Sequence, residues 1–140
     1  MTSITIALAC VAIGPAPTAL AEDDNQFFQD PSGNIKCELT TNYKGVPYAN
    51  CTVAVAAYRT RADNCDTPAS VHPQFSLTQG SEPTSSCVVG SLEYRWPTID
   101  FGQTRSVGTV TCDNEPTGVT CTDTGTRRFF RASGDSYELG

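Results

Sequence analysis

Cysteine placement is the feature that most constrains what this chain can fold into. The sequence holds seven cysteines and a single histidine, His72. Cys10 lies in an apolar N-terminal segment, and the other six follow at Cys37, Cys51, Cys65, Cys87, Cys112 and Cys121. An even set of cysteines in a short exported chain is typical of a disulfide framework. Zinc is the competing use of clustered cysteines, but with no C-x-x-C pair and one histidine we expect neither a metal nor a cofactor.

The N-terminal segment predicts export. Residues 4–13 form an apolar run, residues 14–17 interrupt it, and residues 19–21 (Ala-Leu-Ala) match the small-x-small pattern that signal peptidases cleave. We therefore expect residues 1–21 to be a signal peptide and residues 22–140 to form one domain. The apolar run is too short to span a bilayer as a helix, so we expect no transmembrane anchor.

A lipoprotein is the alternative that this segment leaves open. Leu-Ala-Cys at residues 8–10 is a degenerate lipoprotein box, which would attach a lipid to Cys10 and hold the protein at the membrane surface. In both cases we expect a secreted or cell-envelope location.

The exported domain is acidic. All charged residues lie within residues 22–140, so the formal net charge of −6 belongs to the domain. A general affinity for nucleic acid or anionic lipid is therefore not expected. We expect a monomer whose partner is an envelope component or another protein.

Local geometry favours one of the disulfide pairings that the sequence leaves open. Two alternating β-rich runs flank residues 115–118 (Glu-Pro-Thr-Gly), a turn with proline early and glycine where a positive φ is needed. Folding about this turn sets Cys112 opposite Cys121. Cys37 and Cys51 flank a second bend, at residues 43–47, which makes sequential pairing the first choice. The pairs are then Cys37–Cys51, Cys65–Cys87 and Cys112–Cys121.

The remaining pattern predicts an all-β, mainly antiparallel fold, either a small barrel or a sandwich. Residues 54–61 are the exception, because Ala-Val-Ala-Ala-Tyr-Arg contains good helix formers and could form one short helix. Strand-like segments are expected near residues 35–40, 51–58, 87–91, 107–112, 119–122 and 127–132.

Several of these segments also resemble a known family. Residues 28–37 (Phe-Gln-Asp-Pro-Ser-Gly-Asn-Ile-Lys-Cys) are similar to the F-x-S-P-S-G-N-I-x-C opening of the DUF6636 family, small secreted or lipid-anchored domains found mainly in mycobacteria and related actinobacteria. Residues 101–104, 110–113, 118–121, 130–133 and 137–139 extend the resemblance. It implies export, disulfides and a β-rich fold, and it implies no activity, because the family's function is unknown.

Three motifs suggest chemistry, and each has a simpler structural interpretation. Asp-Thr-Gly at residues 123–125 matches the core of an aspartic-protease loop, but such enzymes need two copies, and a hairpin exit explains it better. Residues 113–118 faintly resemble a calcium loop, but Thr124 stands where the twelfth, acidic ligand should be. His72 precedes a proline without a nucleophile motif, so we interpret it as a solvated loop residue.

The candidate ligand surface combines basic and aromatic residues. Strand periodicity would place Arg127, Phe129 and Arg131 on one face, where arginine donors and an aromatic ring could recognise an anionic or planar group. Trp96, the only tryptophan, is a second candidate contact. The structural alternative is that these arginines balance an acidic domain while the aromatic rings pack.

No catalytic set emerges from these motifs. We therefore expect a non-enzymatic extracellular binding or interaction module of unknown ligand. The alternatives are a small secreted hydrolase that uses a carboxylate pair and a structural envelope protein.

Overall fold

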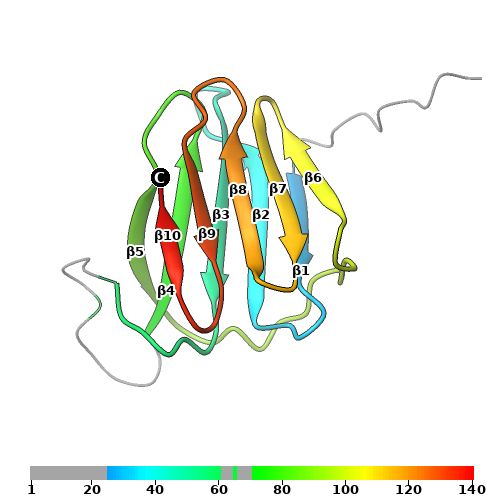
Figure 1. Ribbon diagram of the computed structural model, residues 1–140, viewed down its shortest axis with the longest axis vertical. Coiled ribbons are helices and arrows are strands. Elements are labelled where there is room, and N and C mark those ends of the chain that lie inside the picture. Colours follow the sequence, from blue (N-terminus) through cyan, green and yellow to red (C-terminus); the bar gives the residue numbers. More distant parts are fainter. Residues whose placement is uncertain (1–24, 61–64, 66–70) are drawn as a thin grey trace, which may run out of the picture.

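The described chain is a sandwich of two five-stranded antiparallel sheets (Figure 1). The structure is a computed structural model that describes residues 25–60, 65 and 71–140. The first sheet contains β1 (Asn25–Gln29), β2 (Ile35–Thr41), β3 (Pro47–Val53), β4 (Val71–Thr78) and β5 (Thr84–Val89). The second contains β6 (Thr104–Val107), β7 (Val110–Glu115), β8 (Gly118–Asp123), β9 (Phe129–Ala132) and β10 (Tyr137–Leu139). The expected all-β fold is confirmed, as a sandwich and not as a closed barrel.

Each sheet is made of consecutive strands, in the orders β1-β2-β3-β4-β5 and β10-β9-β8-β7-β6. One connection, residues 90–103, leads from β5 at the edge of the first sheet to β6 at the far edge of the second (Figure 1, yellow-green). We call it the crossing segment. The predicted signal peptide and Cys10 lie outside the described residues.

The core forms where the inward faces of the two sheets meet. Alternation in β2 turns Ile35, Cys37 and Leu39 inward, and alternation in β4 does the same for Phe75 and Leu77. The second sheet contributes residues such as Val110, Val119 and Phe130. Ring centroids of Phe75 and Phe130 lie 6.0 Å apart, so aromatic contacts join the sheets.

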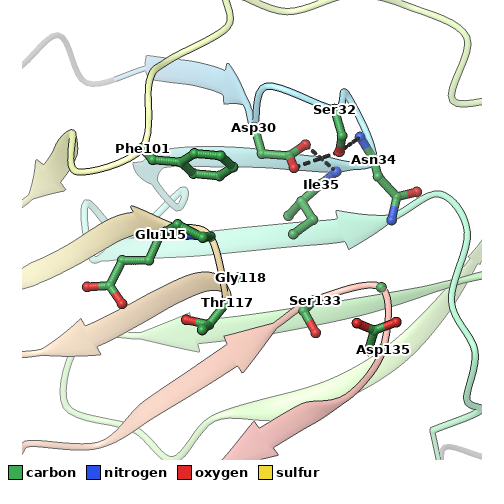
Figure 2. A pocket seen from close by; sticks show the side chains of 12 residues that line it. Asp30, Ser32, Asn34, Ile35, Phe101, Glu115, Thr117, Gly118, Ser133 and Asp135 are labelled. Atoms are coloured by element: carbon green, nitrogen blue, oxygen red, sulfur yellow. Dashed lines mark hydrogen bonds between the residues drawn. The ribbon is translucent and has the colours of Figure 1, made fainter.

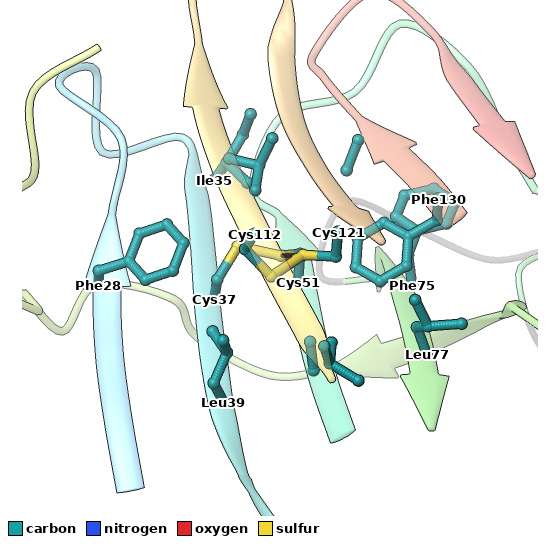
Figure 3. Packing of buried hydrophobic residues seen from close by; sticks show 14 of the residues in the cluster. Phe28, Ile35, Cys37, Leu39, Cys51, Phe75, Leu77, Cys112, Cys121 and Phe130 are labelled. Carbon is teal, nitrogen blue, oxygen red and sulfur yellow. Dashed lines mark hydrogen bonds between the residues drawn. A yellow bond between two sulfur atoms is a disulfide. The ribbon is translucent and has the colours of Figure 1, made fainter. Parts of the chain in front are cut away.

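Two disulfides lie at the centre of this core (Figure 3). Cys37 is bonded to Cys51 across β2 and β3, and Cys112 to Cys121 across β7 and β8. The Sγ atoms of Cys51 and Cys121 are 3.8 Å apart, so the two disulfides touch across the interface between the sheets. The third, Cys65–Cys87, ties the segment before β4 to β5. These are the pairs of the sequential scheme.

The hairpin around residues 115–118 follows its sequence closely. Glu115 pairs with Gly118, Cys112 with Cys121 and Val110 with Asp123, as the turn chemistry predicts. Gly118 adopts a φ of 129°, and a Cβ there would lie 2.4 Å from the carbonyl oxygen of Ala132. A side chain is therefore excluded on both conformational and steric grounds.

The predicted helix near residues 54–61 is wrong. Its described part, residues 54–60, contains bends and no helix. Long-range hydrogen bonds hold this segment in a different conformation: Ala54 N–H donates to the carbonyl of Asn34, and Ala57 N–H donates to that of Gly134. Helix propensity is a weak preference, and these contacts outweigh it.

Three strands, β1, β4 and β10, lie outside the segments expected from the sequence, and β6 shares only Val107 with an expected segment. The segment expected as one strand at residues 107–112 is divided between β6 and β7 by a turn at Gly108, which has a φ of 54°. In β4, Pro73 is tolerated because pairing with β3 begins only at Gln74, so no hydrogen-bond ladder needs its missing N–H on that side. No helix able to cross a membrane occurs in the part of the chain that the structure describes.

Candidate functional site

Side chains with binding chemistry gather on the outer face of the first sheet. Strand register places polar groups side by side across all five strands, in a row formed by Gln29, Lys36, Thr52, Gln74 and Ser86. The outer face of a sandwich is ordinarily solvated, yet Lys36 is only 4% exposed and Thr52 only 6%. Something must therefore cover this row.

The cover is the crossing segment, and Gln29 anchors it. The backbone N–H of Gln29 donates to Pro97 O (2.9 Å), and its carbonyl accepts from Ile99 N (3.1 Å). Its side-chain Oε1 accepts from Trp96 N at 3.2 Å, and Nε2 donates to the Thr98 hydroxyl at 3.2 Å. One buried glutamine thus fixes the position of four consecutive residues of the segment.

Three aromatic rings line this part of the surface. The Trp96 ring lies 5.0 Å from that of Phe27 and 4.9 Å from that of Tyr94, centroid to centroid. Phe27 and Tyr94 are exposed and Trp96 is half-buried. We call these three residues the aromatic cluster. The rings are tilted against one another, and aromatic rings that pack together but remain accessible are a frequent feature of binding surfaces.

Two cavities open beside Tyr94. One has a volume of about 320 Å³ and is lined mainly by polar groups, and the other has a volume of about 260 Å³. Leu92 and Tyr94 line both, so they form the wall between the two hollows. The larger cavity also includes Gln29, Ser32, Gly33, Lys36, Arg95 and Thr98. The smaller includes Thr52, His72, Gln74 and Val88.

Lys36 supplies a cation at the floor of the larger cavity. Its Nζ donates to Gln29 Oε1 at 2.8 Å and to Gly33 O at 3.0 Å, and it lies 5.6 Å from the centre of the Tyr94 ring. Burial lowers the pKa of Lys36; the charge of Asp30 raises it and that of Arg95 lowers it further. Both acceptors are neutral, which is unusual for a buried ammonium group.

Glu38 lies next along β2 on the same outer face. Burial raises the pKa of its carboxyl. Burial and the nearby charge of Glu38 together raise the pKa of both Tyr48 and Tyr94. These shifts have the direction that partial burial of this face produces.

His72 belongs to this site and is not a solvated loop residue, so that interpretation is wrong. It lies in β4, and its Nδ1 is 2.8 Å from Ala54 O while Nε2 is 3.0 Å from Gly90 O. A neutral ring can donate to only one of these oxygens. His72 therefore ties the start of the crossing segment to the end of β3 and has a structural role there.

A third cavity, of about 160 Å³, lies at one end of the sandwich and contains the carboxylates of Asp30, Glu115 and Asp135 (Figure 2). Asp30 accepts hydrogen bonds from the Ser32 hydroxyl (2.7 Å) and from Ile35 N (3.0 Å). Its carboxylate thus closes the turn before β2, and the side chain of Glu115 points away from it in Figure 2. Acidic residues line the cavity, but Asp30 is used within its own turn and Glu115 points away from it, so they do not form a carboxylate pair.

Asp123 also has a structural role, in agreement with the hairpin-exit interpretation. It ends β8, is 1% exposed, and accepts hydrogen bonds from Gly80 N (2.7 Å), the Thr109 hydroxyl (2.6 Å) and Gly125 N (2.9 Å). Burial raises its pKa, but these bonds, with one from Thr126, outweigh burial and hold the pKa below its ordinary value. The carboxylate joins turns of both sheets.

The predicted basic-aromatic surface is not brought together. Phe129 and Arg131 share the outer face of β9, as periodicity predicts, but Arg127 lies in the preceding turn with a φ of 65°. Arg131 is occupied by Thr117 O (3.2 Å) and the Ser136 hydroxyl (3.0 Å), and it is 3.9 Å from Glu138. These residues belong to the second sheet, whereas Trp96 lies over the first.

Among the residues that the structure describes, no group of three or more histidine, cysteine or acidic side chains is placed to hold a metal ion. The segment that resembles a calcium loop is the hairpin between β7 and β8, where Asp113 accepts a hydrogen bond from the Thr104 hydroxyl at 2.7 Å.

Comparison with family models, curated proteins and solved structures gives no match. The resemblance to the DUF6636 family therefore stays a prediction.

Sequence reasoning identified Trp96 but missed Lys36, Tyr94 and Arg95. The alternation of β2 does place Lys36 on the outer face, which was the available signal. Alternation gives no indication that the segment around Trp96, sixty residues further along the chain, would cover Lys36.

Proposed function

We propose that this protein is a non-catalytic, exported binding module that takes its ligand on the outer face of the first sheet, beneath and beside the crossing segment. The ligand would be a component of the cell envelope or another extracellular molecule. The aromatic cluster would supply the stacking surface, and the polar row across the strands would supply hydrogen bonds.

The observation that carries this proposal is the pair of cavities divided by Tyr94. Binding sites are concave, and they combine an aromatic or apolar wall with a few convergent polar groups. The two cavities share Leu92 and Tyr94 as a wall. Polar side chains line most of the larger cavity, and in the smaller one Thr52, His72 and Gln74 lie beside Val88 and Val89. The disulfides hold the sheet beneath them, which makes the surface rigid.

The carboxylate-pair alternative has weaker support. Of the acids in the end cavity, Asp30 is committed to the Ser32 hydroxyl and to Ile35 N, both within the turn that precedes β2. A general acid or base needs a carboxyl group free to exchange a proton with a substrate. The proposed role is therefore binding without catalysis.

Trp96 provides a direct test, because the chain contains one tryptophan and it lies in the aromatic cluster. The mature protein would be titrated with soluble fragments of bacterial cell wall while tryptophan fluorescence is recorded. We expect a saturable change that Tyr94→Ala weakens by about tenfold or more, as loss of a stacked ring predicts.

The matched control is Tyr43→Ala. Tyr43 is 92% exposed in the turn between β2 and β3, so the same truncation there removes a ring without touching either cavity. Equal weakening by the two variants, or no response of the wild-type protein to any wall fraction, would refute binding at this face and favour the structural-protein alternative.

A further inference from the structure

The larger cavity beside Tyr94 holds two cations, Lys36 and Arg95, that form no ion pair with any described residue. We infer that this cavity binds an oxyanion group of the ligand, a carboxylate or a phosphate, between Lys36 Nζ and the Arg95 guanidinium. The inference deepens the proposed function, because it names the ligand chemistry of the same face, and it rests on that function.

The hydrogen bonding of Lys36 is incomplete. An ammonium group has three N–H donors, and in this cavity two of them reach neutral oxygens, Gln29 Oε1 and Gly33 O. No carboxylate of the described residues lies within ion-pair distance of Nζ, since the two ion pairs found involve Arg128 and Arg131. Buried charges are normally paired. An anion would supply the missing partner.

Arg95 lines the same cavity from the crossing segment. Its guanidinium makes no hydrogen bond or ion pair with any residue that the structure describes, so its five N–H donors remain available. Its charge is close enough to Lys36 to lower the pKa of that amine. Two cations that repel one another across a polar cavity are arranged to share an anion.

The remaining walls of the cavity also suit an oxyanion. The Thr98 hydroxyl accepts from Gln29 Nε2 and donates to no described residue, which leaves its proton for an oxyanion. Tyr94 offers a ring face at the rim. A volume of about 320 Å³ suits a small ligand or one residue of a larger one.

Opposing charges are also present and limit the affinity. Glu93 lines the rim of the cavity, Asp30 acts on Lys36 from the turn before β2, and the whole chain carries a net charge of −6. Long-range attraction therefore does not favour an anion. Recognition has to come from direct contact with Lys36 and Arg95, so a free anion should bind weakly and the complete ligand more tightly.

The test uses amide and indole NMR shifts of the isotope-labelled mature protein. Inorganic phosphate and acetate are titrated separately at constant ionic strength set with chloride, so that the two arms distinguish a phosphate from a carboxylate ligand. We expect saturable shifts at Gly33, Lys36, Arg95 and Trp96 with at least one of the two anions. Lys36→Met and Arg95→Gln should each weaken that binding by about tenfold or more.

Arg127→Gln is the matched control, because it removes the same charge from a turn of the second sheet. It should leave anion binding unchanged. Equal weakening by Arg127→Gln, shifts spread over the arginines of the second sheet, or no saturable shift with either anion would overturn the inference. Arg95 is exposed, so Arg95→Gln remains informative even where Lys36→Met fails to fold.

The same variants separate this inference from the proposed function. A response of Trp96 to wall fragments that depends on Tyr94 but not on Lys36 or Arg95 would overturn the anion site and leave the binding face intact. Anion binding at Lys36 and Arg95 without any response to wall fragments would uphold the site and count against the proposed ligand source.

Discussion

Lys36 and Asp123 are both charged side chains removed from water on folding, and both have a lowered pKa. Their surroundings differ. The Asp123 carboxylate accepts hydrogen bonds from backbone and hydroxyl donors of three turns, so its charge is satisfied by the protein. The Lys36 ammonium donates to two neutral oxygens and faces a cavity with a second cation.

The contrast shows how the bonding of a buried charge separates structural roles from binding roles. For Asp123, hydrogen bonds outweigh burial and stabilise the charged form, so the charge contributes to folding. For Lys36, burial is the largest influence and it disfavours the charged form. Burial of the Lys36 charge therefore lowers the stability of the domain, and a role in ligand binding would explain its presence.

Replacement of Asp123 should have the largest effect. We expect Asp123→Asn to lower the free energy of unfolding by about 2–4 kcal/mol, because an amide cannot accept from all the donors that surround the carboxylate. Urea unfolding followed by circular dichroism would measure this loss. Lys36→Met should change the stability by about 1 kcal/mol or less, since it removes a cation together with its desolvation cost. A larger loss for Lys36→Met than for Asp123→Asn would reverse the comparison.

Asp123 and Lys36 should affect the stability in different pH ranges, Asp123 in the acid range and Lys36 in the alkaline range. The folded-state pKa of Asp123 is depressed, so its contribution is present above the unfolded value of 3.8 and is lost as the pH falls through the folded pKa. The pKa of Lys36 is lowered from 10.5, so stability should rise as the pH increases from the folded pKa toward 10.5.

The measurement is the free energy of unfolding against pH for the wild-type protein and both variants. Asp123→Asn should flatten the acid slope alone, and Lys36→Met should flatten the alkaline slope alone. Tyr48 and Tyr94, whose pKa values are raised, also titrate above pH 10, and their contribution cancels in the difference between wild type and Lys36→Met. If Asp123→Asn leaves the acid slope unchanged, other carboxyl groups cause that slope.

The smallest effect is expected at Arg127, a cation that contacts neither the Asp123 carboxylate nor the Lys36 cavity. Its φ of 65° favours glycine, so Arg127→Gly should raise the free energy of unfolding by about 0.5–1 kcal/mol. Thermal unfolding would detect the gain. Loss of stability on this change would mean that the Arg127 side chain makes contacts that its exposed position does not suggest.

The fold was largely predictable because its signals are local. The turn at residues 115–118 determines the register of β7 and β8, and that register places Cys112 opposite Cys121. Where local chemistry was ambiguous the prediction failed. Residues 54–60 have good helix propensity, but their amide groups are used by Asn34 and Gly134, which lie far away in the chain.

The candidate site was much less predictable, for a physical reason. Lys36 and Arg95 come together only because Gln29 holds the crossing segment over the first sheet through contacts with residues 96–99. Alternation predicts the face of Lys36 but not what covers that face. The expected grouping of Arg127, Phe129 and Arg131 is incomplete for a related reason, since periodicity indicates neither the turn at Arg127 nor the hydrogen bonds of Arg131 to Thr117 and Ser136.

The simple order of the strands has a consequence for how the molecule is held together. Cys37–Cys51 and Cys65–Cys87 stay within the first sheet and Cys112–Cys121 within the second, so among the described cysteines no covalent cross-link joins the two halves. The backbone of the crossing segment is the only tether between β5 and β6. One proteolytic cut there would turn the domain into a non-covalent pair of half-molecules, held by core packing and by hydrogen bonds such as that from Gly80 N to Asp123. Because Tyr94 and Arg95 lie on that tether, a ligand held against the first sheet would also protect the connection on which the integrity of the domain depends.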